Sequence, residues 1–273
     1  MKKMTLIIII VGLLLLSSTN VLAAWSQGYD GVSYYTTNGN CAFGDRAGAQ
    51  YVQNLHDRLR DYGIANAGSV YKDNLAWESD LTSGFADSKQ FFAFAGHGLD
   101  SSTSIGQSTA HFYTMNSSSI FHTNEYAGAA NASWDEIRWG NNQMRWATMY
   151  NCNFLRNGGS TTNEQNIQKM FEGLRLMMGF ASRMYLDSRE ASTYSYGIGM
   201  GWTIKTAFFT GAESYQPQLG AGHGWPNANQ VVARVKGYTS AGNNDIYTST
   251  GAKAPRWIDQ PSSFSTWDDV ISL

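Results

Sequence analysis

Long hydrophobic runs, charged residues and cysteines are all scarce in this sequence. After residue 23 no apolar run approaches the ~20 residues that a membrane-spanning helix needs, so we expect no membrane partner once the N-terminal segment is gone. Charged residues make up 15% of the chain, with a formal net charge of −2 and no basic block. These features argue against nucleic acid as a partner. The sequence also lacks internal repeats and low-complexity linkers, which favours a single domain.

Only two cysteines occur, Cys41 and Cys152. In an oxidising compartment an even pair favours a disulfide, and a Cys41–Cys152 bridge would close a long loop. Two other interpretations of Cys152 stay open at this point. A cysteine can act as a nucleophile, or it can fill space as a small buried hydrophobe.

The N-terminus has the layout of a secretory signal peptide. Lys2 and Lys3 precede an apolar stretch from Leu6 to Leu16, and small residues lead to Ala23. This pattern predicts cleavage after residue 23, a mature chain of residues 24–273, and a location outside the cytoplasm, secreted or in the cell envelope. An uncleaved N-terminal anchor is the alternative, although the apolar stretch is short for a membrane span.

Three short apolar runs predict strands that are buried on both faces, as in a parallel sheet. They alternate with segments of helical periodicity, which indicates βαβ units and one α/β domain with a mainly parallel central sheet. The predicted strands are residues 91–95, 146–150 and 176–181, with further strands at 32–36 and 231–235; the predicted helices are 45–62, 166–174 and 196–209; residues 237–273 are expected to be irregular.

Two of these buried strands end at residues whose side chains could take part in catalysis. The first runs into Gly96-His97-Gly98 and the second into Asn151-Cys152. Ligands of open parallel sheets bind beyond the carboxyl ends of the strands, so we expect both side chains at one edge. A thiol becomes a strong nucleophile when a nearby imidazole takes its proton, and the N–H groups of Gly98 and Cys152 would suit an oxyanion.

With an apolar strand ending in His-Gly and a later one ending in Cys, the chain resembles the clan of cysteine peptidases that includes caspases, gingipains, legumains and clostripain. The run from Phe171 to Leu174, leading into Met178 to Ser182, is similar to the strand that follows the catalytic cysteine in that clan. The resemblance implies a caspase-like three-layer α/β sandwich, a His97–Cys152 catalytic dyad, and a protein or peptide substrate. It implies no cofactor.

More narrowly, the chain resembles an uncharacterised microbial family known only as a domain of unknown function, over residues 75–215. Asn151 departs from the clan, several members of which have Ala or Asp before the cysteine. Asp187, after the third strand, is a candidate for binding a basic substrate residue.

His111 and His122 lack further ligands at metal-binding spacing, so we expect surface histidines and no metal site. The competing hypothesis is a catalytically inactive binding protein of the cell envelope, with a Cys41–Cys152 disulfide and aromatic-rich binding loops.

Overall fold

The computed structural model describes most of the chain beyond residue 23. Residues 1–23, Cys41, His97 and Gly98 lie outside the described residues, and so does most of the segment between the strands at 91–95 and 146–150. The described residues are 24–31, 33, 47–66, 68–72, 75–76, 78–82, 84–96, 111–113, 131–133, 137–156, 161–220, 230–249 and 252–273.

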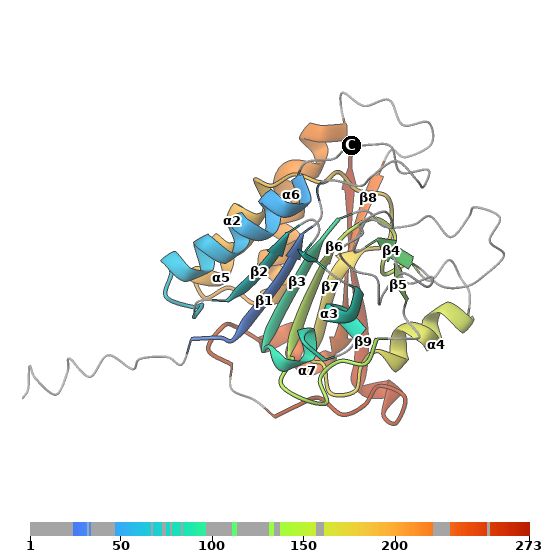
Figure 1. Ribbon diagram of the computed structural model, residues 1–273. Coiled ribbons are helices and arrows are strands. Elements are labelled where there is room, and N and C mark those ends of the chain that lie inside the picture. Colours follow the sequence, from blue (N-terminus) through green and yellow to red (C-terminus); the bar gives the residue numbers. More distant parts are fainter. Residues whose placement is uncertain are drawn as a thin grey trace, which may run out of the picture.

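A seven-stranded mixed sheet forms the centre of the molecule (Figure 1). Its order is β2-β1-β3-β6-β7-β8-β9; the first five strands are parallel, whereas β8 is antiparallel to β7 and β9 to β8. The strands are β1 (Gln27–Gly31), β2 (Ser69–Lys72), β3 (Phe91–Ala95), β6 (Trp146–Tyr150), β7 (Leu176–Phe180), β8 (Gln230–Tyr238) and β9 (Phe264–Ser272).

The three apolar runs occupy the middle of this sheet, as the sequence predicted. β3 and β6 are parallel neighbours, with Phe91 beside Trp146 and Ala95 beside Tyr150. β7 follows on the other side of β6. Every residue of the three strands is buried, because helices and loops cover both faces of the sheet.

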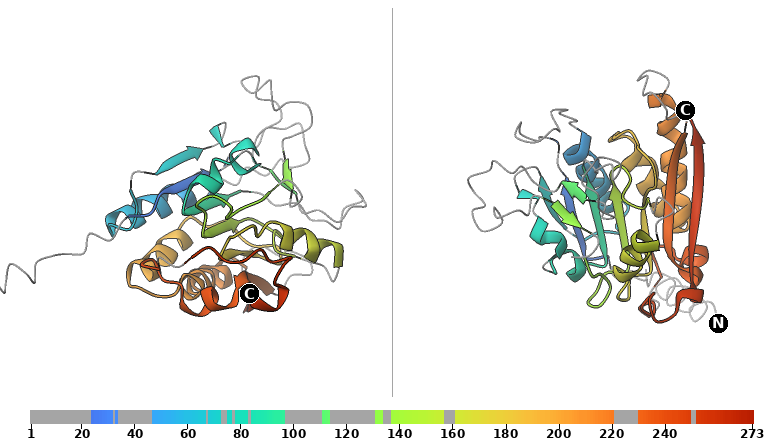
Figure 2. Two further views of the ribbon diagram at one scale, coloured as in Figure 1. Left: turned by 90° about the horizontal axis from the view of Figure 1, so that it is seen from below. Right: turned by 90° about the vertical axis from the view of Figure 1, so that its right-hand side faces the viewer.

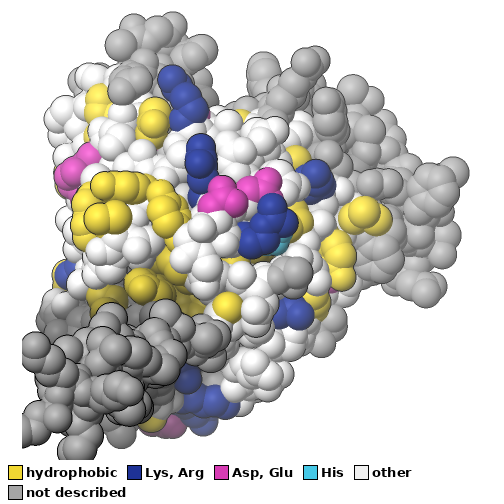
Figure 3. All heavy atoms as spheres, turned by 90° about the vertical axis from the view of Figure 1, so that its left-hand side faces the viewer, with side chains coloured by type: hydrophobic (Ala, Val, Ile, Leu, Met, Phe, Trp, Pro, Cys, Tyr) yellow, Lys and Arg dark blue, Asp and Glu magenta, His cyan; other side chains and the backbone are white. Residues whose placement is uncertain are grey.

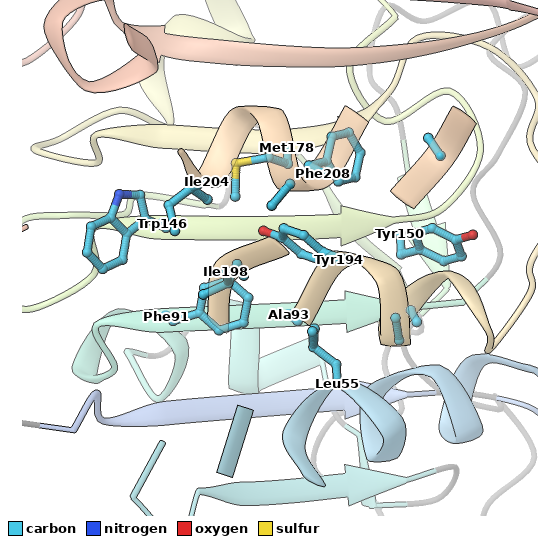
Figure 4. Packing of buried hydrophobic residues seen from close by; sticks show 14 of the residues in the cluster. Leu55, Phe91, Ala93, Trp146, Tyr150, Met178, Tyr194, Ile198, Ile204 and Phe208 are labelled. Carbon is cyan, nitrogen blue, oxygen red and sulfur yellow. The ribbon is translucent and has the colours of Figure 1, made fainter. Parts of the chain in front are cut away.

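Helices flank the sheet on both faces (Figure 2). One face is covered by α2 (Ala47–Asp61), α5 (Glu190–Gly199) and α6 (Ile204–Gly220), and the other by α3 (Glu78–Thr82) and α4 (Thr161–Lys169). Figure 4 shows the first of the two cores, in which side chains from the strands meet side chains from these helices, among them Leu55, Phe91, Ala93, Trp146, Met178, Tyr194, Ile198, Ile204 and Phe208.

Helix α2 confirms the prediction for residues 45–62 in its type and in most of its buried face; Tyr62, predicted on the same face, follows the helix and is exposed. Val52, Leu55 and Leu59 are fully buried, as their spacing of three and four residues requires. Gly63 follows the helix with φ of +69°, the left-handed conformation that glycine adopts readily at the end of a helix.

The helix predicted over residues 196–209 is two helices. α5 ends at Gly199, Gly201 has φ of +79°, and α6 begins at Ile204. Thr203 caps α6, since its Oγ1 accepts a hydrogen bond from the Thr206 amide at 3.1 Å.

Of the strand predicted over residues 32–36, only Ser33 lies within the described residues, and it is not in a strand; β1 ends just before it, at Gly31. Two other boundaries differ from the prediction. Helix α4 ends at Lys169, and the chain then forms an isolated bridge between Phe171 and Trp139. The strand predicted over residues 231–235 is part of the longer β8, which runs from Gln230 to Tyr238.

The C-terminal segment expected to be irregular contains regular structure. Residues 237–273 include the end of β8, α7 (Thr239–Asn244), the short helix η3 (Pro261–Ser263) and β9. β9 pairs with β8 along its full length, from Phe264 beside Tyr238 to Ser272 beside Gln230. The parallel centre of the sheet therefore continues into an antiparallel edge.

Three smaller elements complete the description. The short helix η2 (Ala86–Ser88) precedes β3, and β4 (His111–Tyr113) pairs antiparallel with β5 (Asn131–Ser133). Among the described helices, none has the length and apolar character needed to cross a membrane.

Candidate active site

The carboxyl ends of β3 and β6 lie side by side. Ala95 is in register with Tyr150, and the Gly96 amide donates a hydrogen bond to the Tyr150 carbonyl at 3.2 Å. The next residue along the first chain segment is His97, and Cys152 is the second residue after Tyr150. The strands that lead to the predicted dyad are thus adjacent and parallel. The geometry of His97 and Gly98 lies outside the described residues, so their predicted roles stay predictions.

Cys152 is half-buried in a turn that follows β6. Its Sγ accepts a hydrogen bond from the Met184 amide at 3.4 Å and donates one to the Met184 carbonyl at 3.5 Å. Asn151, directly before it, is fully buried, and its side-chain amide has no hydrogen-bond partner among the described residues. The pairing of Cys152 with Cys41 falls outside the part of the chain that the structure describes.

The turn is attached to the segment that follows β7. Asn153 has φ of +59°, a conformation that asparagine tolerates better than most residues. Its amide donates to the Ser182 carbonyl at 2.8 Å, and the Leu155 amide donates to the Phe180 carbonyl at 2.9 Å. These bonds place Cys152 against residues 182–185.

Asp187 lies further along the same segment and is already paired. Arg189 Nη2 is 2.5 Å from Asp187 Oδ2, and Arg189 Nε contacts both carboxylate oxygens. Burial opposes ionisation of the carboxyl, but the hydrogen bonds and charge of Arg189 outweigh it and lower the pKa of Asp187. The Arg189 guanidinium also lies 5.0 Å over the ring of Tyr215. A basic substrate residue at Asp187 would therefore compete with Arg189.

A buried polar cluster lies behind this segment. Gln216 of α6 is fully buried; its Oε1 accepts from the Tyr185 amide at 2.9 Å, and its Nε2 donates to the Tyr185 carbonyl at 2.8 Å. Nε2 also donates to Glu190 Oε2 at 3.0 Å. Burial raises the pKa of Glu190 well above its ordinary value, and the Gln216 hydrogen bond offsets this only in part. Sequence reasoning did not identify either residue.

Asp30 is a second buried carboxyl group, located on β1. It is fully buried, and neither of its oxygens has a hydrogen-bond partner among the described residues. Burial, and then the charge of Asp80 on α3, raise the pKa of Asp30 well above its ordinary value.

The described residues contain no group of three His, Cys, Asp or Glu side chains that would hold a metal ion. Of the two histidines considered for a metal, His111 lies in β4, whose side chains are not described, and His122 lies outside the described residues.

Large hydrophobic side chains, most of them aromatic, are exposed near the ends of α2 and α5. Tyr62, Tyr196, Met200 and Trp202 are each at least 36% exposed, and the rings of Tyr196 and Trp202 meet edge to face at 6.0 Å. Figure 3 shows the side of the molecule nearest these helix ends, where hydrophobic side chains gather beside charged ones. This surface is relevant to the hypothesis of an inactive binding protein.

The sheet order and its helical cover define an α/β protein with a mixed seven-stranded sheet and a half-buried cysteine at the carboxyl edge. Residues 29–268 match the family described as a domain of unknown function (DUF6345), and the chain belongs to that family. A comparison with curated proteins found no match.

Proposed function

We propose that this protein is an exported cysteine peptidase with a caspase-like fold, in which Cys152 is the nucleophile and His97 the general base. The observation that carries the proposal is the adjacency of β3 and β6, joined at their carboxyl ends by the Gly96–Tyr150 hydrogen bond. Parallel strands direct their following loops to one edge, where two side chains from different loops can meet. The mainly parallel centre of the sheet is also what the resemblance to the clan implied.

The proposed reaction hydrolyses a peptide bond in two stages. His97 takes the thiol proton, and the Cys152 sulfur attacks the peptide carbonyl carbon. The N–H groups of Gly98 and Cys152 bind the oxyanion of the tetrahedral intermediate. This intermediate collapses as His97 protonates the leaving amine, which leaves an acyl-enzyme. Water, deprotonated by His97, then releases the acid and restores the thiol. These groups need no cofactor.

Asp187 is the candidate for selecting a basic residue before the scissile bond. In this role its carboxylate would exchange Arg189 for the substrate cation. Arg189 is more than half exposed, so its displacement into water costs little. The position of Asp187 on the segment that also contacts Cys152 supports this role.

The test uses the mature protein, residues 24–273, with Cys152→Ala and His97→Ala variants. Each is incubated with quenched fluorescent peptide mixtures that cover every residue type before the scissile bond. We expect cleavage by the parent protein and none by Cys152→Ala, with thermal melts showing that both are folded. Cleavage that persists in Cys152→Ala, or no cleavage of any mixture, would contradict the proposal.

Mass spectrometry of the secreted protein without reducing agent tests the competing hypothesis. We expect Cys152 to be alkylated without prior reduction. A closed Cys41–Cys152 disulfide would instead favour the inactive binding protein, with the exposed aromatic residues near α2 and α5 as its contact surface.

A further inference from the structure

The geometry points to Gln216 as a positioning residue that holds the Met184–Tyr185 segment against the Cys152 thiol and thereby favours the thiolate. Gln216 lies 64 positions from Cys152 in the sequence and binds Tyr185, the residue directly after the one that contacts the Cys152 sulfur. This inference deepens the proposed function and rests on it, because it concerns how the nucleophile of that reaction is prepared.

Gln216 binds one residue, Tyr185, at both of its backbone polar groups. Its side-chain amide accepts from the Tyr185 N–H and donates to the Tyr185 C=O, as a neighbouring β-strand would. Two hydrogen bonds to one residue fix the position and rotation of the backbone there. A third bond, from Nε2 to Glu190, sets which end of the Gln216 amide faces the Tyr185 N–H.

Met184 is the next residue back along the chain, and both of its backbone polar groups contact Cys152 Sγ. The two contacts have opposite effects on the thiol. The carbonyl holds the thiol proton, whereas the N–H remains a donor after ionisation and then forms a charge-assisted bond. Because S–H is a weak donor, the bond from the N–H is the stronger of the two, and the arrangement favours the thiolate.

Glu190 supports this arrangement as a neutral acid. It is almost fully buried, and burial favours its protonated form. Its Oε2 accepts from Gln216, so a neutral isostere at this position keeps the bond that orients the Gln216 amide. Loss of Gln216 itself removes the support of the Met184 N–H.

The experiment measures alkylation of Cys152 by iodoacetamide from about pH 6 to pH 10, a range that covers the ordinary thiol pKa of ~8.5. All proteins carry Cys41→Ser, so only Cys152 reacts. We expect Gln216→Met to move the midpoint of the rate profile upward by about half a unit to one unit, which slows alkylation roughly three- to tenfold at pH 7. The rates should converge at high pH, where every thiol is ionised.

Three further variants make the result specific. Gln216→Asn shortens the side chain but stays polar, and we expect a shift in the same direction even if Gln216→Met folds poorly. Glu190→Gln should leave the profile unchanged. Thr148→Val removes another buried hydrogen bond on the same face of the sheet, to Tyr194, and should lower stability without moving the midpoint.

An unchanged midpoint in both folded Gln216 variants would overturn the inference, as would faster alkylation at pH 7 or an equal shift in Glu190→Gln or Thr148→Val. The result is separable from the proposed function, because alkylation needs no substrate. Peptide cleavage that depends on Cys152, together with an unmoved midpoint, refutes only the role of Gln216. A shifted midpoint without any cleavage refutes only the peptidase.

Discussion

The Gly96 amide donates a hydrogen bond to the Tyr150 carbonyl at the point where β3 and β6 end. This bond is the last link between the two strands before the chain leaves toward His97 and Cys152. We expect the Gly96 amide to exchange with solvent as slowly as the amides inside β3, because its hydrogen bond to Tyr150 breaks only when the two strands separate. Hydrogen exchange followed by NMR measures this directly. Exchange as fast as that of an exposed loop would show that the strands separate before Ala95.

The buried carboxyl of Asp30 predicts a stability that decreases with rising pH. Its pKa in the folded protein lies above the unfolded value of ~3.9, so its contribution is complete below about pH 4 and is lost as the pH rises through the folded pKa. We expect Asp30→Asn to melt like the parent near pH 4 and at a higher temperature near pH 7. Each kcal/mol gained corresponds to roughly 2–4 °C in a domain of this size.

Asp187→Asn is the matched control for Asp30→Asn, because the pKa of Asp187 is shifted in the opposite direction. Its contribution is present above the unfolded pKa and is lost as the pH falls through the folded one. We expect this variant to melt slightly lower near pH 7 and unchanged in strong acid. An Asp30→Asn variant that is less stable at neutral pH would contradict the assignment of a raised pKa.

A buried ion pair joins Arg175, directly before β7, to Asp245, directly after α7. Arg175 Nε and Nη2 each lie 2.7 Å from an oxygen of Asp245, and the Trp146 indole donates to the same carboxylate at 2.8 Å. Removing one partner leaves a buried charge, so we expect Asp245→Asn to lower the free energy of unfolding by about 3–5 kcal/mol in urea titrations. Asp268→Asn, which breaks the more exposed pair with Arg234, should cost at most about 1 kcal/mol.

Position 140 requires glycine because the backbone at Gly173 and Leu174 passes close to it. A Cβ at this position would lie 1.9 Å from the Leu174 nitrogen, and φ is +95°. We expect Gly140→Ala to reduce the melting temperature far more than Gly84→Ala. Gly84 has a similar φ of +98° but open space around it, so its substitution costs only the backbone strain of about 1–2 kcal/mol. Equal losses in the two variants would mean that the contact with Leu174 is absent.

The predicted signal peptide, residues 1–23, can be tested without an activity assay. We expect N-terminal sequencing of the protein recovered from outside the cytoplasm to begin at Ala24, or at Trp25 if cleavage shifts by one residue. If residues 1–23 are retained, the protein is anchored by its N-terminus and is not secreted.

The sequence was most informative where burial is uniform. The runs at 91–95, 146–150 and 176–180 are apolar throughout because both of their faces are covered, and this pattern predicted strands correctly. β1 was not predicted because its residues, Gln-Gly-Tyr-Asp-Gly, are mostly polar or small, although all five are buried. β9 was missed because an edge strand exposes every second residue, and its sequence includes Asp268 and Asp269.

The candidate site was predictable only in part. Motifs at the ends of strands indicated His97 and Cys152, because a strand end is a local signal. The contacts of Cys152 with Met184, and of Tyr185 with Gln216, join segments far apart in the chain and leave no local pattern. Arg189 is a different case, because it lies only two residues from Asp187: the sequence offered Asp187 as a substrate ligand, and the structure pairs it with this near neighbour.

The pairing of β3 with β6 also bears on how the family can vary. These strands are neighbours, yet residues 96–145 separate them along the chain, and the described residues Ile137, Trp139 and Met144 of this connection are buried in the core. The entropy of closing a loop grows slowly with its length, by about 0.6 kcal/mol for each doubling. Changes of length between Gly96 and Ile137 should therefore cost little, so relatives can vary that part of the connection while keeping the same sheet and the core residues that precede β6.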